Sequence, residues 1–158
     1  MDMAAPPELV FRLARDVERW AELLPHYVSV EARERRADGS LVARMVARRP
    51  LVGALGLGLP VAWQARTWNE PDGLRLRFQH RGGATNGMDV TWRIEAHDGG
   101  SRVTIEHDFR PRFRPWASVV DRFFTRPIAT RTLATFRTLA EALAGETSDA
   151  SSMTNGEP

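Results

Sequence analysis

The sequence predicts an α+β domain in which a curved antiparallel sheet wraps around a long C-terminal helix, with two short helices near the N-terminus. Three observations support this fold class. Residues 128–143 have the apolar spacing of an amphipathic helix. Residues 26–110 contain successive segments of alternating apolar and polar residues with short turns between them, which is typical of an antiparallel meander. Residues 6–25 have helical spacing instead.

The N-terminal segment predicts a strand stub and two short helices. Residues 1–5 are long enough only for the stub. Pro6-Pro7-Glu8 is typical of a first helical turn, where an amide hydrogen has no partner within the helix and proline therefore costs no hydrogen bond. The helices are too short to form a core alone, so we expect them to cover one end of the sheet. Their apolar stripes are Leu9, Val10, Leu13 and Ala14, then Val17, Trp20, Leu23 and Leu24 before Pro25.

Strands are predicted at residues 26–35, 41–48, 60–68, 74–80, 88–95 and 101–109. Gly-containing or Pro-containing turns separate most of them. The alternation also predicts which side chains face the core. In the fourth segment Leu74, Leu76, Phe78 and His80 point inward between outward-facing polar residues.

The C-terminal helix presents a wide apolar face, within roughly 140° of arc, that needs a partner surface. Pro127 predicts a kink, or a separate short helix over residues 116–124 ahead of the main one. The ordered domain is expected to cover residues 1–144, and the acidic segment 145–158 is expected to be a disordered tail. The apolar face comprises Ile128, Ala129, Thr132, Leu133, Phe136, Leu139, Ala140 and Leu143.

The composition, 42% hydrophobic and 27% charged, is ordinary for a soluble globular domain. No apolar run approaches the ~20 residues of a membrane span and no signal peptide is recognisable, so a cytoplasmic location is the default expectation. The absence of cysteine excludes disulfides, a thiolate nucleophile and cysteine-bound zinc. The four histidines lack metal-site spacing, and nothing in the sequence requires a cofactor.

The charge distribution argues against nucleic-acid binding. All 22 basic residues are arginine, but 20 acidic residues nearly balance them and leave a net charge of +2. Basic residues interleaved with aromatic ones occur only in the short run 110–115. We therefore expect no nucleic-acid partner.

Several short motifs occur in a characteristic order. They are APPELVF at 5–11, DVERW at 16–20, LPHY at 24–27, MDVTWR at 88–93, GGSRV at 99–103 and EHDF at 106–109. Together they resemble the START-like (SRPBCC) superfamily, most closely its polyketide cyclase/dehydrase (aromatase/cyclase) branch, to which coenzyme-Q-binding proteins are related. The resemblance covers about residues 4–144. It implies a helix-grip fold with a deep cavity, between sheet and helix, that takes a hydrophobic and often polyaromatic ligand.

His107 and Tyr27 are the candidate catalytic residues. His107 lies on an apolar strand face, where an imidazole loses solvation unless it finds a hydrogen-bond partner. The resemblance implies a polar cavity side chain at 107 and a pocket tyrosine at 27, whose phenol can donate a proton to a ligand carbonyl. A structural core histidine and an amphipathic strand residue are the alternatives. His26 and His97 are expected to be peripheral.

The expected ligand-binding residues are inward-facing and surround the same cavity. Small inward residues leave room beside the aromatic ones, and the alternative is a core packed to normal density. The resemblance implies an inward-facing arginine on the strand that contains Trp63. In this sequence the arginine of that strand is Arg66, which is in the outward register, so no arginine is expected in the cavity unless a bulge turns Arg66 inward. The ligand-binding candidates are Trp20, Leu24, Met45, Trp63, Ala65, Thr67, Phe78, His80, Met88, Trp92, Phe109 and Phe136.

The resemblance leaves two functions open. One is an enzyme, needing no cofactor, that cyclises and dehydrates a poly-β-keto or aromatic chain. The other is a non-catalytic carrier of a lipid or quinone in the same cavity. Arg110, Arg112 and Arg114 form either a solvated face or a dock for an acidic acyl carrier protein. The apolar, glycine-rich residues 50–60 predict a flap over the cavity or, at most, a peripheral membrane contact.

Overall fold

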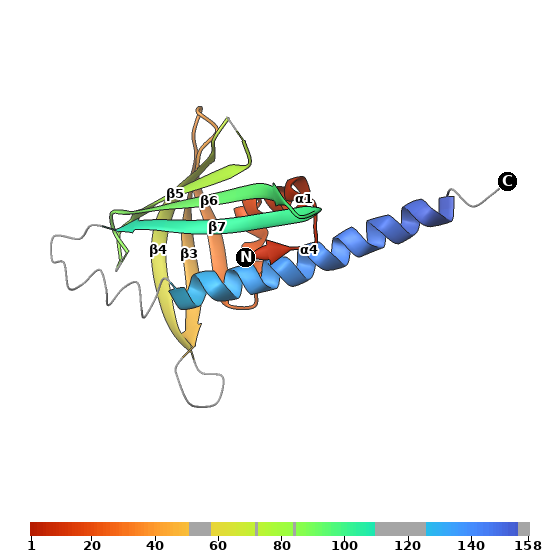
Figure 1. The fold of residues 1–158 in the computed structure, drawn as a ribbon. Coiled ribbons are helices and arrows are strands. Elements are labelled where there is room, and N and C mark those ends of the chain that lie inside the picture. Colours follow the sequence, from red (N-terminus) through yellow and green to blue (C-terminus); the bar gives the residue numbers. More distant parts are fainter. Residues whose placement is uncertain (51–57, 72, 84, 110–125, 155–158) are drawn as a thin grey trace.

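The structure is a computed structural model that describes residues 1–50, 58–71, 73–83, 85–109 and 126–154. Its strands form one seven-stranded antiparallel sheet in the order β1-β7-β6-β5-β4-β3-β2. Figure 1 shows the sheet curving around α4, with α1 at one end, so the predicted architecture is confirmed. The elements are β1 (Asp2–Met3), α1 (Pro7–Arg15), η1 (Val17–Arg19), α2 (Trp20–Leu23), β2 (Tyr27–Arg35), β3 (Leu41–Pro50), β4 (Gly58–Asn69), β5 (Arg75–Arg81), β6 (Met88–His97), β7 (Gly100–Phe109) and α4 (Arg126–Thr154).

The inward face of the sheet follows the predicted alternation. Antiparallel pairing places inward residues in rows, such as Met45 beside Trp63 and Leu76 beside Trp92, and these rows form the surface that faces α4. The buried inward residues are Leu41, Ala43, Met45 and Ala47 on β3, Trp63, Ala65 and Thr67 on β4, Leu76 and Phe78 on β5, Met88, Val90, Trp92 and Ile94 on β6, and Val103 on β7.

The first strand is a stub, as predicted, and it pairs with the start of β7. The Asp2 carboxylate accepts hydrogen bonds of 2.6 and 2.9 Å from Arg102, and these bonds lower the pKa of Asp2 to about 2. Gly100 permits the close approach of the two segments, because a Cβ atom there would lie 2.2 Å from the Met3 carbonyl oxygen. The stub is therefore fixed to the sheet despite its length.

α4 begins at Arg126 and carries Pro127 in its first turn, where the missing amide hydrogen costs nothing. Three residues of the predicted apolar face, Thr132, Phe136 and Ala140, are buried against the sheet. The predicted short helix over residues 116–124 lies outside the described residues.

The sequence predicts a disordered tail from Gly145, but α4 continues as a helix to Thr154. Gly145 does not end the helix, because a single glycine costs only about 1 kcal/mol inside a helix and no proline follows before Thr154. The Thr147 hydroxyl also donates a 3.1 Å hydrogen bond to the Leu143 carbonyl. Figure 1 shows this part of α4 extending beyond the sheet.

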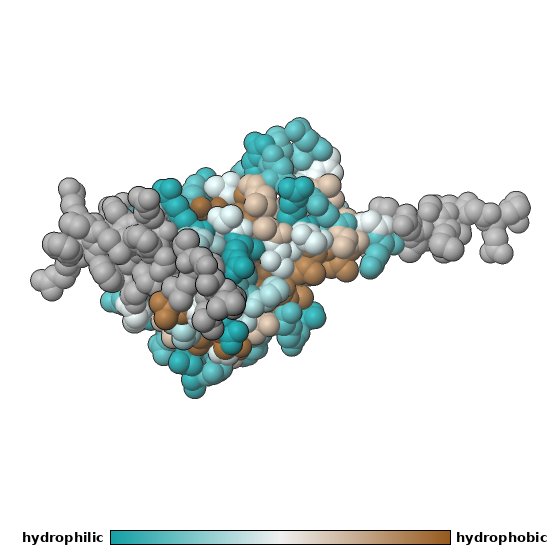
Figure 2. All heavy atoms as spheres, turned by 90° about the horizontal axis from the view of Figure 1, so that it is seen from below, coloured by the Kyte–Doolittle hydropathy of each residue, from teal (hydrophilic) through white to brown (hydrophobic). Residues whose placement is uncertain are grey.

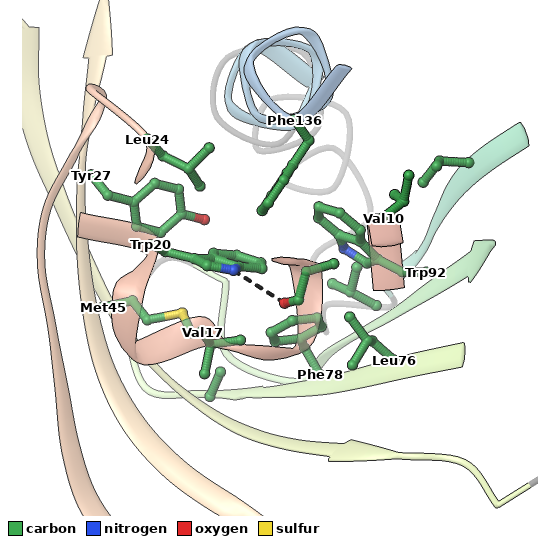
Figure 3. Close-up of a cluster of buried hydrophobic side chains, with 14 of the residues drawn as sticks. Val10, Val17, Trp20, Leu24, Tyr27, Met45, Leu76, Phe78, Trp92 and Phe136 are labelled. Carbon is green, nitrogen blue, oxygen red and sulfur yellow. Dashed lines mark hydrogen bonds between the residues drawn. The ribbon is translucent and has the colours of Figure 1, made fainter. Parts of the chain in front are cut away.

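Trp20, from α2, is the centre of an aromatic cluster that closes one end of the interior (Figure 3). Its ring centroid lies 5.3 to 5.8 Å from those of Tyr27, Phe78, Trp92 and Phe136, on four different elements. Its indole N–H donates a 3.1 Å hydrogen bond to the Ala14 carbonyl. The short N-terminal helices are thereby tied to both the sheet and α4.

The outer surface is mostly polar. Figure 2 shows hydrophilic residues over much of one face, with hydrophobic residues in small groups between them. Among the described residues, the large apolar side chains counted as exposed are Met1, Val28, Leu59 and Leu143. No described helix combines the length and the hydropathy required to cross a membrane.

Replacing Trp20 with alanine should lower the free energy of unfolding by about 3–5 kcal/mol, because the change leaves a large void among four aromatic rings. Urea unfolding followed by circular dichroism measures this loss. Val28→Ala, at a side chain 47% exposed, is the control and should change stability by less than about 0.5 kcal/mol. A loss below about 1 kcal/mol for Trp20→Ala would show that the cluster is not the organising contact.

Candidate functional site

A cavity of about 70 Å³ lies between the sheet and the first turns of α4. Its walls are mainly apolar and aromatic, and hydroxyl and imidazole groups interrupt them. Nine of the predicted site residues line it: Trp20, Tyr27, Met45, Trp63, Phe78, His80, Met88, Trp92 and His107. The other lining residues are Val61, Thr85, Val90, Ile105, Ile128, Ala129 and Thr132.

The cavity is smaller than the deep one expected from the family resemblance. Drug-sized ligands typically occupy about 300–1,000 Å³, whereas a volume of about 70 Å³ holds only a few waters. Large side chains explain the difference, because the rings of Trp20, Phe78 and Trp92, which line the cavity, pack against one another and fill part of the interior. A multi-ring ligand would therefore have to displace some of these side chains.

Tyr27 is buried at the start of β2, and Figure 3 shows its hydroxyl directed into the interior. Burial raises the pKa of this phenol well above its ordinary value of 10, against a smaller opposing effect of its hydrogen bond with Thr132. The phenol therefore stays protonated at neutral pH. It can act as a proton or hydrogen-bond donor and not as a base.

His26 is buried beside Tyr27, so the expectation that it is peripheral is wrong. Its Nε2 lies 2.9 Å from Thr132 Oγ1, and the Thr132 hydroxyl donates to the Ile128 carbonyl at 2.9 Å. The Thr132 oxygen must then accept from His26, which fixes the Nε2–H tautomer. Burial, followed by the charge of Arg131, lowers the pKa of His26 to about 4. His26 lies just before the first residue of β2, so the alternation of the strand does not predict that it contacts α4.

His80 lies across the cavity at the end of β5. Its ring stacks on Trp63 at 5.7 Å and its Nδ1 lies 2.9 Å from Thr85 Oγ1. Burial, and then the nearby His107, lower the pKa of His80 to about 3, so it is neutral at physiological pH. His107, half-buried on β7, lines the same cavity and also a more open groove between β7 and α4. Two imidazoles thus face one small apolar space.

Thr85 reaches His80 because Gly83, two residues before it, lies against β4. Gly83 has a φ of +68°, and a Cβ atom there would lie 2.7 Å from the Ala62 carbonyl oxygen. Any larger residue would push the loop away from the strand. Thr85 was not predicted as a site residue, since a hairpin loop has no periodicity to reveal where it folds back.

The remaining predicted binding residues do not line the cavity. Leu24, Ala65, Thr67 and Phe136 are buried in the core around it, and Phe109 is half-buried. Val61, Val90 and Ile105 do line it, and their positions two residues from predicted members on the same strands could have identified them. Ile128, Ala129 and Thr132 lie on the predicted helix face.

Arg66 faces away from the cavity, as the strand register predicts. Its guanidinium donates to Asp38 Oδ2 at 2.6 Å and to Ser40 Oγ at 3.0 Å, and it lies 5.1 Å from the centre of the Trp68 ring. These contacts occupy the arginine on the outer face, and no arginine of the described chain lines the cavity.

Some predicted features fall outside the described residues. They are the basic cluster Arg110, Arg112 and Arg114, and most of the apolar segment 50–60. Within the described ranges, no three His, Asp or Glu side chains gather as a metal site.

The sheet curved around α4 defines a helix-grip fold, and a mostly apolar cavity lies between the two. The chain belongs to the family described as polyketide cyclase / dehydrase and lipid transport, whose model matches residues 3–136. The resemblance noted in the sequence is therefore confirmed.

Individual relatives agree with this assignment. A Streptomyces cyaneus protein named "Putative polyketide cyclase" is 27% identical over 124 residues, covering 78% of this chain and 76% of that protein. The Zhui aromatase/cyclase from Streptomyces sp. R1128 is similar with a TM-score of 0.71 at 20% identity, covering 89% of this chain and 90% of that one. A START superfamily protein from Mycobacterium smegmatis has a TM-score of 0.67 at 13% identity, covering 90% and 94%. The two structural likenesses establish the fold.

The stability of the protein should fall on acidification because of His26. Its folded-state pKa lies below its ordinary value, so the neutral form is favoured by folding; the contribution is complete above pH 6.5 and is lost as the pH falls towards 4. His26→Gln keeps an N–H donor but cannot titrate. Between pH 7 and 4.5 it should lose roughly 2–3 kcal/mol less than the wild type, measured by urea unfolding. His97→Gln is the control, and equal losses for His26→Gln and wild type would contradict the assignment.

Proposed function

We propose that this protein binds an apolar, polyketide-like aromatic molecule in the cavity and promotes its cyclisation and dehydration. The observation that carries the proposal is the grouping of Tyr27, His80 and His107 around an otherwise apolar space, in a chain of this family. Aromatic walls suit flat conjugated ligands, and the few polar groups suit carbonyl or hydroxyl oxygens.

The polar groups suit the proton transfers of an aldol-type ring closure. Such a step removes a proton from a carbon beside one carbonyl, and that carbon then forms a bond to the carbon of a second carbonyl, whose oxygen takes up a proton. Loss of a further proton from the same ring carbon and of this hydroxyl as water gives the double bond. His107 is proposed to take the carbon-bound proton. Tyr27, a neutral phenol, is proposed to exchange its hydrogen bond with Thr132 for one donated to the carbonyl oxygen. The enclosing walls would add to the rate by holding the chain in a folded, reactive shape.

A second candidate function is transport or storage of a lipid or quinone without turnover. The observation in its favour is the outward position of Arg66, bound to Asp38 and Ser40. Because no arginine among the described residues lines the cavity, a developing enolate would depend there on neutral donors alone. Binding without chemistry makes no such demand.

Blocking the cavity should abolish binding under either function. Ala129 lines the cavity, whereas Ala134 is exposed on the same helix, so Ala129→Phe and Ala134→Phe form a matched pair. A naphthoquinone, a fatty acid and a hydroxylated naphthalene serve as ligands, with tryptophan quenching as the readout. We expect micromolar binding of at least one ligand to wild type and Ala134→Phe, and at least tenfold weaker binding to Ala129→Phe. No binding to the wild type would contradict both functions.

His107→Ala and Tyr27→Phe separate the enzyme from the carrier. If these residues transfer protons, each change should lower the rate of cyclisation of a poly-β-keto thioester by about 10²–10⁴-fold with little change in substrate affinity. Product formation is followed by chromatography, and His97→Gln is the control for loss of an imidazole elsewhere. Ligand binding with no wild-type turnover would identify the carrier.

A further inference from the structure

The indole N–H of Trp63 is a buried donor without an acceptor. Trp63 lies on β4, is 7% exposed and forms part of the cavity wall. Its Nε1 has no hydrogen-bond partner within the part of the chain that the structure describes. Unpaired donors at such depth are costly and uncommon, so each one calls for an explanation, such as a functional role or a bound group that supplies the acceptor.

The neighbouring polar groups of the cavity are already engaged with each other. His80 Nδ1 is bonded to Thr85 Oγ1 at 2.9 Å, and Tyr27 is bonded to Thr132. The rings beside Trp63 are those of His80, stacked at an interplanar angle of 19°, and Tyr27, with ring centroids 6.1 Å apart. Among the described residues, no neighbouring group thus supplies an acceptor for the Trp63 indole, and an oxygen of a bound ligand would supply one.

Trp20 shows the opposite arrangement in the same wall. Its indole N–H donates to the Ala14 carbonyl at 3.1 Å and is satisfied within the protein. The two tryptophans are therefore a natural comparison, since both present an apolar ring to the cavity but only Trp63 retains a donor.

We propose that the Trp63 indole N–H donates a hydrogen bond to a carbonyl oxygen of the bound ligand and so selects ketones over hydrocarbons of the same shape. An indole N–H can only donate, so it forms a hydrogen bond with a ligand that carries an acceptor and forms none with a hydrocarbon or an ammonium group. This inference rests on the proposed function, because it requires an apolar ligand in the cavity.

The test compares two small bicyclic probes, the ketone 1-tetralone and its hydrocarbon counterpart tetralin, by isothermal titration calorimetry. Trp63→Phe keeps an aromatic ring and removes the donor. The ratio of ketone affinity to hydrocarbon affinity should fall about three- to tenfold from wild type to Trp63→Phe, as expected for one hydrogen bond. In Trp20→Phe the ratio should stay at its wild-type value, although both affinities can change.

A second measurement follows the Trp63 indole directly in the wild-type protein by NMR. In wild-type protein labelled with ¹⁵N-tryptophan, the indole proton of Trp63 should shift downfield with 1-tetralone and not with tetralin, and the resonance missing from Trp63→Phe identifies it. The inference is overturned if the affinity ratio is unchanged in Trp63→Phe, or if the chemical shift of the Trp63 indole proton does not change with 1-tetralone. Either result would leave ligand binding itself intact. Failure of the wild type to bind either probe removes the proposed function and this inference with it.

Discussion

The packing of one indole, that of Trp20, is the constraint on which the rest of the molecule depends. A short helix outside the sheet supplies the ring, and rings from β2, β5, β6 and α4 surround it. Aromatic pairs at these separations add directional preference to apolar burial, so they fix orientation as well as distance. The sheet can therefore curve around α4 only in the arrangement that receives this ring.

Filling one end of the interior leaves the other end hollow. Beyond the aromatic cluster, the first turns of α4 present Ile128, Ala129 and Thr132, which are smaller than Phe136, whose ring packs against Trp92 of β6. Several polar side chains that line this hollow are held by hydrogen bonds, above all Thr132, whose hydroxyl bonds both to its own helix and to His26 behind the wall. The first turns of α4 therefore line the cavity, whereas Phe136, further along the same helix, packs in the aromatic cluster that stabilises the fold.

Much of this arrangement follows from periodicity in the sequence. Alternation on β3 to β7 predicted which residues face inward, and the outward position of Arg66 followed from the same register, because period 2 leaves little freedom within a regular strand. His26 and Thr85 could not be predicted in this way, since they lie before a strand and in a loop, where tertiary contacts alone determine position. The small volume was equally hidden, because it depends on the rotamers of Trp20, Phe78 and Trp92.

Gly83 couples an exposed turn to the interior. The backbone of its loop lies so close to the Ala62 carbonyl that only a hydrogen atom fits between them. The hydroxyl that orients the His80 imidazole is carried two residues further along. A single methyl group added at this position would therefore move Thr85 and remove the hydrogen-bond partner of His80, leaving the imidazole held by its stacking on Trp63 alone. A substitution at an outer position that does not itself line the cavity would thus change the polar groups inside it.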